Sequence, residues 1–281
     1  MTGLPNLTDR VALARNRAKC RSAGVGLFLH EQAAQELQER LAEVNRRFTS
    51  VAIVTGFPDF WAGIWPAATV VPDNDTLALK PGAHDLIIHG LALHWANDPV
   101  GQLIQCRRAL APDGLFLAAM FGGQTLAELR ICLSEAEVRQ TGGLSPRILP
   151  MAEIRDMGGL LQRAGFGLPV ADSTTFTVTY AHPKALMHDL RAMGEGNALS
   201  ARLRYPTRRA VFTMAEQMYS AQHATPDGRI SARFEMLFLT GWAPHESQQK
   251  PLRPGSAQQR LSEALGLPAN QFPDTDATGS N

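Results

Sequence analysis

Three short apolar runs, with a helical pattern between the last two, constrain the fold of this chain more than any other feature. The runs are "VAIV" (51–54), "DLIIHGLAL" (85–93) and "GLFLAAMF" (114–121), and residues 99–110 have apolar side chains at helical spacing. Strand, helix and strand in this order predict an α/β fold with a mostly parallel sheet and right-handed crossovers. Ligands of such sheets bind at the carboxyl ends of the strands, so the residues after each strand are candidates for a site.

Further elements complete the predicted fold on either side of these runs. Residues 31–48 have apolar side chains at steps of three and four, which is typical of one helical face. A helix that begins near Met151 is expected to end at Gly165, a residue suited to a helix C-terminus. The other predicted elements are a helix within 121–138, a strand over 174–180, helices over 183–193 and 207–222, and a late antiparallel strand over 233–242.

These elements divide the chain into three predicted parts. Residues 1–50 form an N-terminal helical segment, and residues 51–243 form the α/β domain, including a helical lid at about 183–222. Residues 244–281 form an extended and partly disordered tail, because this stretch is rich in Pro, Gln and Ser.

Charge and cysteine content argue against several classes of function. The formal net charge is +1, so neither a nucleic-acid partner nor binding to anionic lipid is expected. No apolar run reaches the length of a membrane span, and the N-terminus lacks a secretory apolar core. The cysteines Cys20, Cys106 and Cys132 lie far apart without a C-x-x-C pair, which argues against a disulfide framework or zinc site. A cytoplasmic protein is therefore predicted.

The stretch "VAIVTGFPDFWAGIW" (51–65) begins like the first strand of a nucleotide-binding domain and then departs from that pattern. A dinucleotide or adenosyl cofactor normally needs two or three glycines after this strand, for a tight turn and close backbone approach. Here Gly56 is followed by Pro58, which lacks an N–H donor, and then by Phe60 and Trp61. The turn is therefore either a nucleoside site or, as we favour, a turn filled by its own side chains.

Polar side chains follow two other predicted strand ends. Asp73 and Asp75 in "PDND" are able to accept hydrogen bonds from a ribose or an adenine amino group, but they also suit an ordinary turn next to proline. His94 and Trp95 follow the strand at 85–91, where imidazole suits acid–base chemistry and indole suits stacking on a planar ligand. In the structural alternative, Trp95 belongs to the core and His94 caps the next helix.

Metal and triad chemistry find no support in the sequence. His84, His89 and His94 recur every five residues, and odd spacing on a strand sends successive side chains to opposite faces. No G-x-S-x-G nucleophile turn is present. We therefore expect no metal site.

The segment "DLIIHGLALHWANDPVGQLIQCRRALAPDGLFLAAMFGGQTLAELR" (85–130) resembles class I S-adenosylmethionine (SAM) methyltransferases. The similarity is closest to the branch that contains the mitochondrial complex I assembly factor of this fold and its alphaproteobacterial relatives, which are themselves similar to the biotin-pathway malonyl-carrier-protein methyltransferase. It covers most of the chain from about 82 to 257. Its other segments are "TGGLSPRILP", "LLQRAGF", "DLRAMGEGNAL" and "LTGWAPHESQQKPLRPGSA".

The resemblance implies a Rossmann-like class I methyltransferase fold and a cofactor site at Gly56, Asp73, Asp75, Gly90 and Leu93. The family has a helix, a strand ending in a ribose-binding acid, a second helix and a third strand before the segment that "DNDTLAL" resembles. Only sixteen residues, 57–72, are present for this stretch, so at least one helix and one strand should be missing. Losing the ribose carboxylate costs about 1.5–3 kcal/mol per charge-assisted hydrogen bond.

Two functions follow from the resemblance. The first is an assembly or interaction protein, a pseudoenzyme with weak or absent SAM binding, whose partner is a respiratory complex subunit. The second is an enzyme, either a SAM-dependent methyltransferase or a protein-arginine hydroxylase acting on such a subunit, with His94 and Trp95 as candidate catalytic residues. Methyl transfer depends mainly on alignment of the reacting groups, so a cofactor that is not held in place argues against the second function.

Overall fold

The computed structural model describes residues 6–23 and 27–248 of the 281-residue chain. The described residues up to His245 form one compact unit by their contacts. The predicted boundary at 50 falls inside this unit, so the division into 1–50, 51–243 and 244–281 stays a prediction. The predicted extended and partly disordered tail lies outside the described residues from 249 onward.

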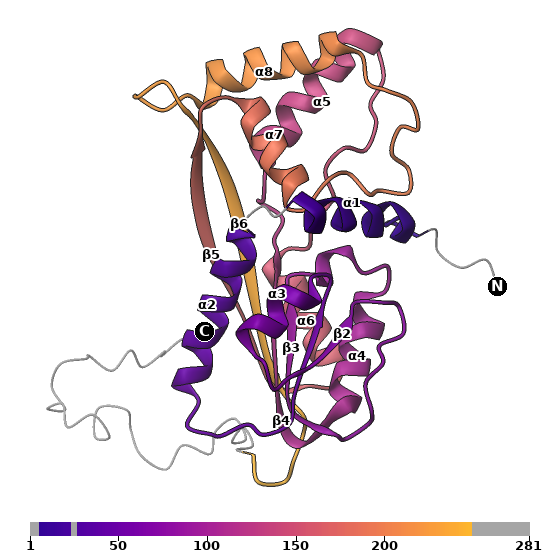
Figure 1. Ribbon diagram of the computed structural model, residues 1–281, viewed down its shortest axis with the longest axis vertical. Helices are drawn as coiled ribbons and strands as arrows, with labels where there is room; N and C mark the ends of the chain where they lie inside the picture. The colour runs from indigo at the N-terminus through magenta and orange to yellow at the C-terminus, as the bar shows by residue number, and fades with distance from the viewer. Residues whose placement is uncertain (1–5, 24–26, 249–281) are drawn as a thin grey trace, which may run out of the picture. The chain divides into compact units, whose positions relative to one another are not determined.

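One sheet of six strands, in the order β2-β1-β3-β4-β6-β5, organises the described residues (Figure 1). Strands β1, β2, β3 and β4 are parallel to one another, and β6 pairs antiparallel with both β4 and β5. The mostly parallel sheet and the late antiparallel strand are therefore confirmed. The strands are β1 (Val51–Thr55), β2 (Thr69–Pro72), β3 (His84–Gly90), β4 (Leu110–Phe121), β5 (Gly167–Tyr180) and β6 (Ile230–Trp242).

Helices cover both faces of this sheet because its central strands are apolar on both sides. Side chains that alternate along β1 and β3 enter two separate core clusters, one with α2 and α3 and the other with α4 and α6. The helices are α1 (Arg10–Ala23), α2 (Phe28–Glu43), α3 (Pro58–Ile64), α4 (Pro99–Ala109), α5 (Ala127–Thr141), α6 (Ile154–Arg163), α7 (Pro183–Ala192) and α8 (Arg209–His223), with a 3-10 turn η1 (Leu93–Trp95).

Several predicted boundaries shift in the structure. The helix expected over 31–48 is α2, which ends at Glu43, so Val44 and Phe48 pack against the core from outside the helix. The strand expected over 85–93 ends at Gly90, because Leu91 turns the chain with a positive φ of 48°. Helix α6 is followed by Gly165 with a φ of 84°, as its predicted role at the helix end requires.

The stretch between β1 and Asp73 lacks a helix and a strand, as its small number of residues predicts. It contains the helix α3 and the strand β2, where the family pattern has two helices and two strands. Because β2 pairs in parallel with β1, it occupies the position next to the first strand, and the sheet ends there.

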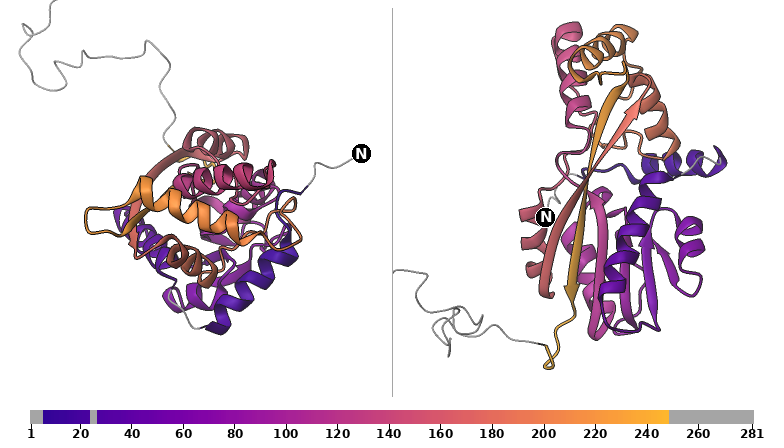
Figure 2. Two further views of the ribbon diagram at one scale, coloured as in Figure 1. Left: turned by 90° about the horizontal axis from the view of Figure 1, so that it is seen from above. Right: turned by 90° about the vertical axis from the view of Figure 1, so that its left-hand side faces the viewer.

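The ribbon formed by β5 and β6 connects the sheet to the helices of the predicted lid. Met236 of β6 pairs with Phe121 at the end of β4, so residues 230–235 extend beyond that edge and pair with β5. Figure 2 shows this ribbon running past the other strands toward α5, α7 and α8. The lid helices therefore lie on the side of the carboxyl ends of the strands, where a parallel sheet binds its ligands.

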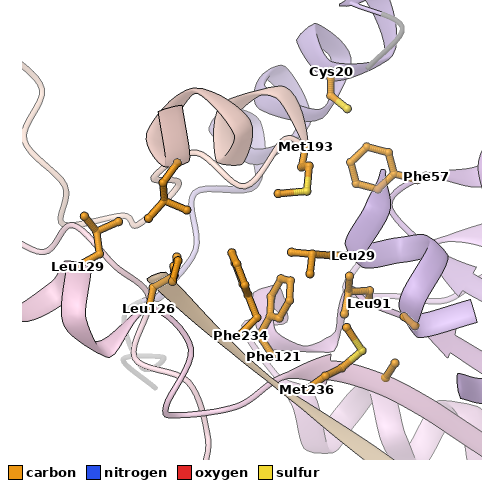
Figure 3. Packing of buried hydrophobic residues seen from close by; sticks show 14 of the residues in the cluster. Cys20, Leu29, Phe57, Leu91, Phe121, Leu126, Leu129, Met193, Phe234 and Met236 are labelled. Carbon is orange, nitrogen blue, oxygen red and sulfur yellow. The ribbon is translucent and has the colours of Figure 1, made fainter. Parts of the chain in front are cut away.

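The N-terminal helices, the sheet and the lid share one buried core. Figure 3 shows Cys20 of α1, Leu29 of α2 and Phe57 after β1 in the same cluster as Phe121 and Phe234 of the central strands. The centroids of the Phe121 and Phe234 rings are 6.4 Å apart. Helix α1, which the sequence pattern did not single out, is therefore packed into the fold.

Candidate functional site

Gly56, Asp73 and Gly90 lie at the ends of three neighbouring strands. Thr55 pairs in register with both Pro72 of β2 and Gly90 of β3, so the residues that follow these strands begin at one level. The Thr55 hydroxyl donates to the Gly90 carbonyl over 3.1 Å and accepts from the Phe57 N–H over 3.2 Å. The structure therefore brings together three of the five residues that the resemblance assigns to a cofactor.

The guanidinium of Arg17, on α1, lies directly over Gly56. A Cβ atom added at Gly56 would be 2.2 Å from Arg17 Cζ and 2.3 Å from its Nη1, which is far inside contact distance. Arg17 is 6% exposed, and its Nη1 lies 2.7 Å from Asp73 Oδ1. Gly56 is thus needed for close approach, but the group that approaches it is a side chain of the protein itself.

The carboxylate of Asp73, the residue after β2, pairs with two arginines. Its Oδ2 lies 3.2 Å from Arg10 Nη1, its Oδ1 contacts Arg17, and only 3% of the residue is exposed. Burial raises the pKa of Asp73, but the charges and hydrogen bonds of Arg17 and Arg10 outweigh it and lower the pKa below its usual value. Asp73 is therefore more than the ordinary turn residue of the structural alternative, because it is a buried anion that fixes α1 to the sheet.

Gly90 is covered by Trp61 of α3. A Cβ atom at Gly90 would be 2.5 Å from Cε2 of the indole, and Trp61 is fully buried. The indole Nε1–H donates to His30 Nδ1 over 3.2 Å, and the ring stacks on Trp65 with centroids 5.7 Å apart. Burial lowers the pKa of His30 to about 3. Side chains of α1, α2 and α3 therefore fill the space beside both glycines.

The other two residues assigned to the cofactor lie elsewhere. Leu93 is 1% exposed and belongs to the core cluster on the α4 face of the sheet. Asp75 is exposed, and its backbone carbonyl accepts a hydrogen bond from Gln105 over 2.9 Å. Their assignment to a cofactor stays a prediction.

His94 and Trp95 of η1 meet Glu195, which follows α7. The Trp95 Nε1–H donates to Glu195 Oε2 over 2.9 Å, and His94 Nε2 lies 3.6 Å from the same oxygen. Neither ring nitrogen of His94 has a hydrogen-bond partner among the described residues. The alternative in which His94 caps the next helix is wrong, since Asp98 caps α4 by accepting from the Gly101 N–H over 2.8 Å.

Glu195 is a charged group held in a largely buried place. Its side chain is 9% exposed. Burial raises its pKa, but neighbouring His94, Arg17 and His30 outweigh that effect and lower the pKa below its usual value. Trp95 belongs to the core, as its structural alternative states, because it is 3% exposed. Its indole nevertheless presents a hydrogen bond to this carboxylate.

A cavity of about 520 Å³, here called the lid pocket, adjoins this group. Trp95 and Glu195 line one part of it, and apolar side chains of α5, α7 and α8 line another part, among them Leu129, Leu133 and Phe212. Its size and its apolar lining with a few polar groups are typical of small-molecule and side-chain binding sites. The lid pocket and the filled space over Gly56 are therefore two different parts of one sheet edge.

Arg17 and Glu195 were missed by sequence reasoning. A signal for the first existed: Arg10 and Arg17 are seven residues apart, which places them on one face of a helix. For Glu195, the signal was its place in the segment "DLRAMGEGNAL", where a charged residue lies between Gly194 and Gly196.

Within the part of the chain that the structure describes, no group of three or more His, Cys, Asp and Glu side chains lies close enough to hold a metal ion. None of the helices in the described ranges combines the length and the apolar character needed to cross a bilayer.

No protein-family model matches the chain, whereas sequence relatives do. The human protein named "Arginine-hydroxylase NDUFAF5, mitochondrial" is 38% identical over 208 residues, which are 74% of this chain and 60% of the relative. The Dictyostelium discoideum protein of the same name is 43% identical over 183 residues, which are 65% of this chain and 42% of the relative. The chain thus spans about half the length of these curated relatives.

A second group of relatives has a different name. A Halorhodospira halophila protein named "Malonyl-(acyl-carrier protein) O-methyltransferase" is 34% identical over 173 residues, which are 62% of this chain and 57% of the relative. Among solved structures, a Bacillus halodurans protein described as a methyltransferase matches with a TM-score of 0.50 and 13% identity, covering 76% of this chain and all of that one. At this identity the match shows the fold, which is the Rossmann-like fold of methyltransferases.

Proposed function

The chain is a relative of NDUFAF5 with the class I methyltransferase fold, and on this premise we propose that it acts as an assembly or interaction protein with weak or absent SAM binding. The relatives named NDUFAF5 carry the word hydroxylase, and the resemblance of the sequence implies a role in assembling a respiratory complex. The proposed partner is therefore a protein subunit of such a complex.

The observation that carries this proposal is the position of Arg17 over Gly56. An adenosyl group placed beside β1 needs the space that this guanidinium occupies. A ribose that engaged Asp73 would take the carboxylate from Arg17 and leave a buried cation without its partner. Breaking a buried ion pair in this way costs about 3–5 kcal/mol, which weakens binding by more than roughly a hundredfold.

Helix α1 is also held from its other side, which makes its displacement by a cofactor more costly. The Asn16 Nδ2–H donates to the Gly196 carbonyl over 3.0 Å, and the Asp9 N–H donates to the Ala198 carbonyl over 2.7 Å. Asp9 Oδ2 lies 2.9 Å from Arg202 Nη1. A cofactor that moved α1 would break these contacts together with the pair to Asp73.

An enzyme is the second candidate, and the cluster of His94, Trp95 and Glu195 favours it. These side chains lie next to the lid pocket, where a substrate would approach, and imidazole and carboxylate are suited to proton transfer. On this proposal the protein is a SAM-dependent methyltransferase, or an arginine hydroxylase like the relatives of that name, acting on a respiratory complex subunit.

The cellular location of the protein is also part of the proposal. The sequence predicts a cytoplasmic protein, whereas the NDUFAF5 relatives are named mitochondrial. The predicted absence of a nucleic-acid partner rests on the net charge of +1.

Capture of partner proteins on the full chain tests the main proposal. We expect a respiratory-chain subunit to be retained equally with and without added SAM or S-adenosylhomocysteine. Retention that requires SAM would contradict an interaction protein that works without it and would favour the enzyme.

A further inference from the structure

Helix α1 and the segment after Leu199 enclose a second cavity, which shares no described lining residue with the lid pocket. Its volume is about 440 Å³, and its charged lining residues are Asp9, Arg15, Arg202 and Arg204. We call this cavity the basic groove, because three arginines face one carboxylate in it and leave an excess of positive charge.

The single acidic residue of the basic groove is already committed within the protein. Asp9 Oδ1 accepts from the Ala12 N–H over 3.0 Å, at the start of α1. Asp9 Oδ2 lies 2.9 Å from Arg202 Nη1 and 3.1 Å from Arg204 Nη1. One negative charge therefore offsets two arginines only in part. Arg15 is exposed and has no ion-pair partner among the described residues, so its guanidinium is available to a ligand.

Backbone contacts hold the two sides of the basic groove together. The Asp9 N–H donates to the Ala198 carbonyl over 2.7 Å, and the Ser200 N–H donates to the Leu7 carbonyl over 2.8 Å. Arg204 Nη2 also donates to the Ser200 carbonyl over 3.0 Å, which fixes part of its side chain. Groups that are held in place before binding lose less conformational entropy when a ligand arrives.

We propose that the basic groove binds an acidic segment of a partner protein, whose Asp or Glu carboxylates pair with Arg15 and Arg204. Guanidinium groups suit this role because they bind a carboxylate through two parallel hydrogen bonds. Val11 also lines the groove, lies one helical turn before Arg15 and is 80% exposed. Tyr205, next to Arg204, is 69% exposed. An acidic segment that also carries an apolar side chain covers these exposed apolar groups while its carboxylates reach the arginines.

The charge pattern around the groove favours a protein segment over a nucleic acid or a membrane. Residues 196–215 contain four arginines and no acidic residue, and Arg208 and Arg209 are exposed. The net charge of the whole chain is only +1, so the positive charge is local. A segment with a few carboxylates matches a local patch, whereas nucleic acids and anionic membranes gain affinity from contacts spread over a wide basic surface.

This inference rests on the proposed function in one respect, which is that the ligand is a protein segment. The basic groove uses neither the space over Gly56 nor the lid pocket, so an acidic peptide binds without SAM. Failure of the peptide to bind would overturn the role of the groove alone. Retention of a subunit only with SAM would contradict the proposed function and leave the peptide result unchanged.

The test is calorimetric titration of the full chain, at low ionic strength, with the blocked peptide Ser-Glu-Leu-Glu-Ser. The comparison peptides carry glutamine or lysine in place of both glutamates, and glutamine keeps nearly the same shape without the charge. We expect the glutamate peptide to bind at least tenfold more tightly than the glutamine peptide, with a smaller difference as salt is added. Equal binding of these two peptides, preference for lysine, or no binding of any peptide would overturn the proposal.

Two other anionic probes test the class of ligand. They are vesicles that contain phosphatidylglycerol and a single-stranded oligothymidine. We expect both to bind more weakly than the glutamate peptide. Tighter binding of either one would contradict a groove that is specific for an acidic protein segment.

Charge-reversal variants assign the effect to the groove. Arg15→Glu combined with Arg204→Glu should reduce the preference for glutamate over glutamine to less than twofold. Arg155→Glu combined with Arg163→Glu is the matched control, because both arginines are exposed on α6 and the net charge changes equally. An unchanged preference in the groove variant, or an equal loss in the control, would contradict the proposal.

A single substitution keeps the test decisive should the double variant not fold. Arg15→Gln removes an exposed charge that has no ion-pair partner among the described residues, so the fold is expected to be retained. It should reduce the preference for glutamate over glutamine at least threefold, and a preference equal to that of the unaltered chain would overturn the role of Arg15.

Discussion

The carboxyl edge of the sheet is filled beside β1 and hollow beside β4. At β1, the side chains of Arg17 and Trp61 occupy the space next to Gly56 and Gly90, and Asp73 is held by two arginines. At β4, Phe121 and the adjacent Trp95 border a cavity of about 520 Å³ that Glu195 also lines. The same edge of the sheet thus has one region whose space is filled by side chains and one region with space for a ligand.

The difference teaches which residues determine whether a strand end can bind a ligand. Toward their carboxyl ends the strands β1 and β4 are both buried, so the sheet itself does not distinguish the two regions. What distinguishes them is a helix from outside the sheet, since α1 brings Arg17 to one region, while α5, α7 and α8 enclose space at the other. Substitutions in the filled region should therefore affect folding, and those in the lid pocket should affect binding.

Removing the buried anion of the filled region is the strongest test of this difference. Asp73→Ala leaves Arg17 buried without its partner, and we expect the free energy of unfolding to fall by about 3–5 kcal/mol. Equilibrium unfolding in urea measures the change. A second variant, Arg17→Met combined with Asp73→Leu, removes both charges and should recover most of the loss. A loss below roughly 1 kcal/mol for Asp73→Ala would show that the pair does not hold α1 in place.

Acidification should also weaken the filled region. Burial lowers the pKa of His30 to about 3 and that of His89 to about 4, whereas both have a pKa near 6.5 in the unfolded chain. Stability is therefore complete above pH 6.5 and falls as pH decreases, because only the unfolded chain then takes up these protons. Between pH 6.5 and 5 the loss is about 2 kcal/mol for each histidine.

The slope of unfolding free energy against pH measures this effect. His30→Gln should remove the share of the loss that His30 causes, about 2 kcal/mol between pH 6.5 and 5. His188→Gln, at an exposed position on α7, is the control and should leave the slope unchanged. A slope that His30→Gln does not alter would contradict the burial of a neutral His30 beside Trp61.

A methyl group at Gly90 should have a smaller effect. Gly90→Ala places an atom 2.5 Å from the Trp61 ring, and overpacking of this kind destabilises by about 1–3 kcal/mol. Gly63→Ala is the control in the same region, since that glycine is exposed on α3 with no atom within 4 Å of the added group, and the change should stabilise the helix slightly. Thermal unfolding compares the two, and equal midpoints would show that Trp61 does not fill the space beside Gly90.

The smallest effect on folding is expected in the lid pocket. Glu195→Gln still accepts from the Trp95 indole, so we expect the free energy of unfolding to change by less than about 1 kcal/mol. The same urea experiment measures it beside Asp73→Ala. A loss as large as that of Asp73→Ala would remove the difference between the two regions.

Much of the fold could be predicted from the sequence because apolar spacing determines it. The runs at 51–54 and 114–121 lie in parallel strands, residues 99–110 form α4 with one residue of difference, and the late strand is β6. The small number of residues in the stretch 57–72 also correctly predicted that a helix and a strand of the family pattern are missing. These features depend on local periodicity, which one sequence contains.

The site was less accessible to prediction because it depends on contacts between distant residues. Gly56, Asp73 and Gly90 do meet, since each follows a neighbouring strand. Arg17 lies 56 residues from Asp73 in sequence, and no local pattern indicates that the two form a buried pair. Glu195, 100 residues from Trp95, was missed for the same reason.

Calorimetric titration of the full chain with SAM and with S-adenosylhomocysteine tests the central claim most directly. With Arg17 over Gly56 and Asp73 committed to two arginines, we expect no heat of binding for either compound at concentrations up to about the millimolar range, which corresponds to less than roughly 4 kcal/mol of binding free energy. Micromolar binding of either compound would contradict the account, because it would mean that α1 and its arginines do not occupy the place of the cofactor.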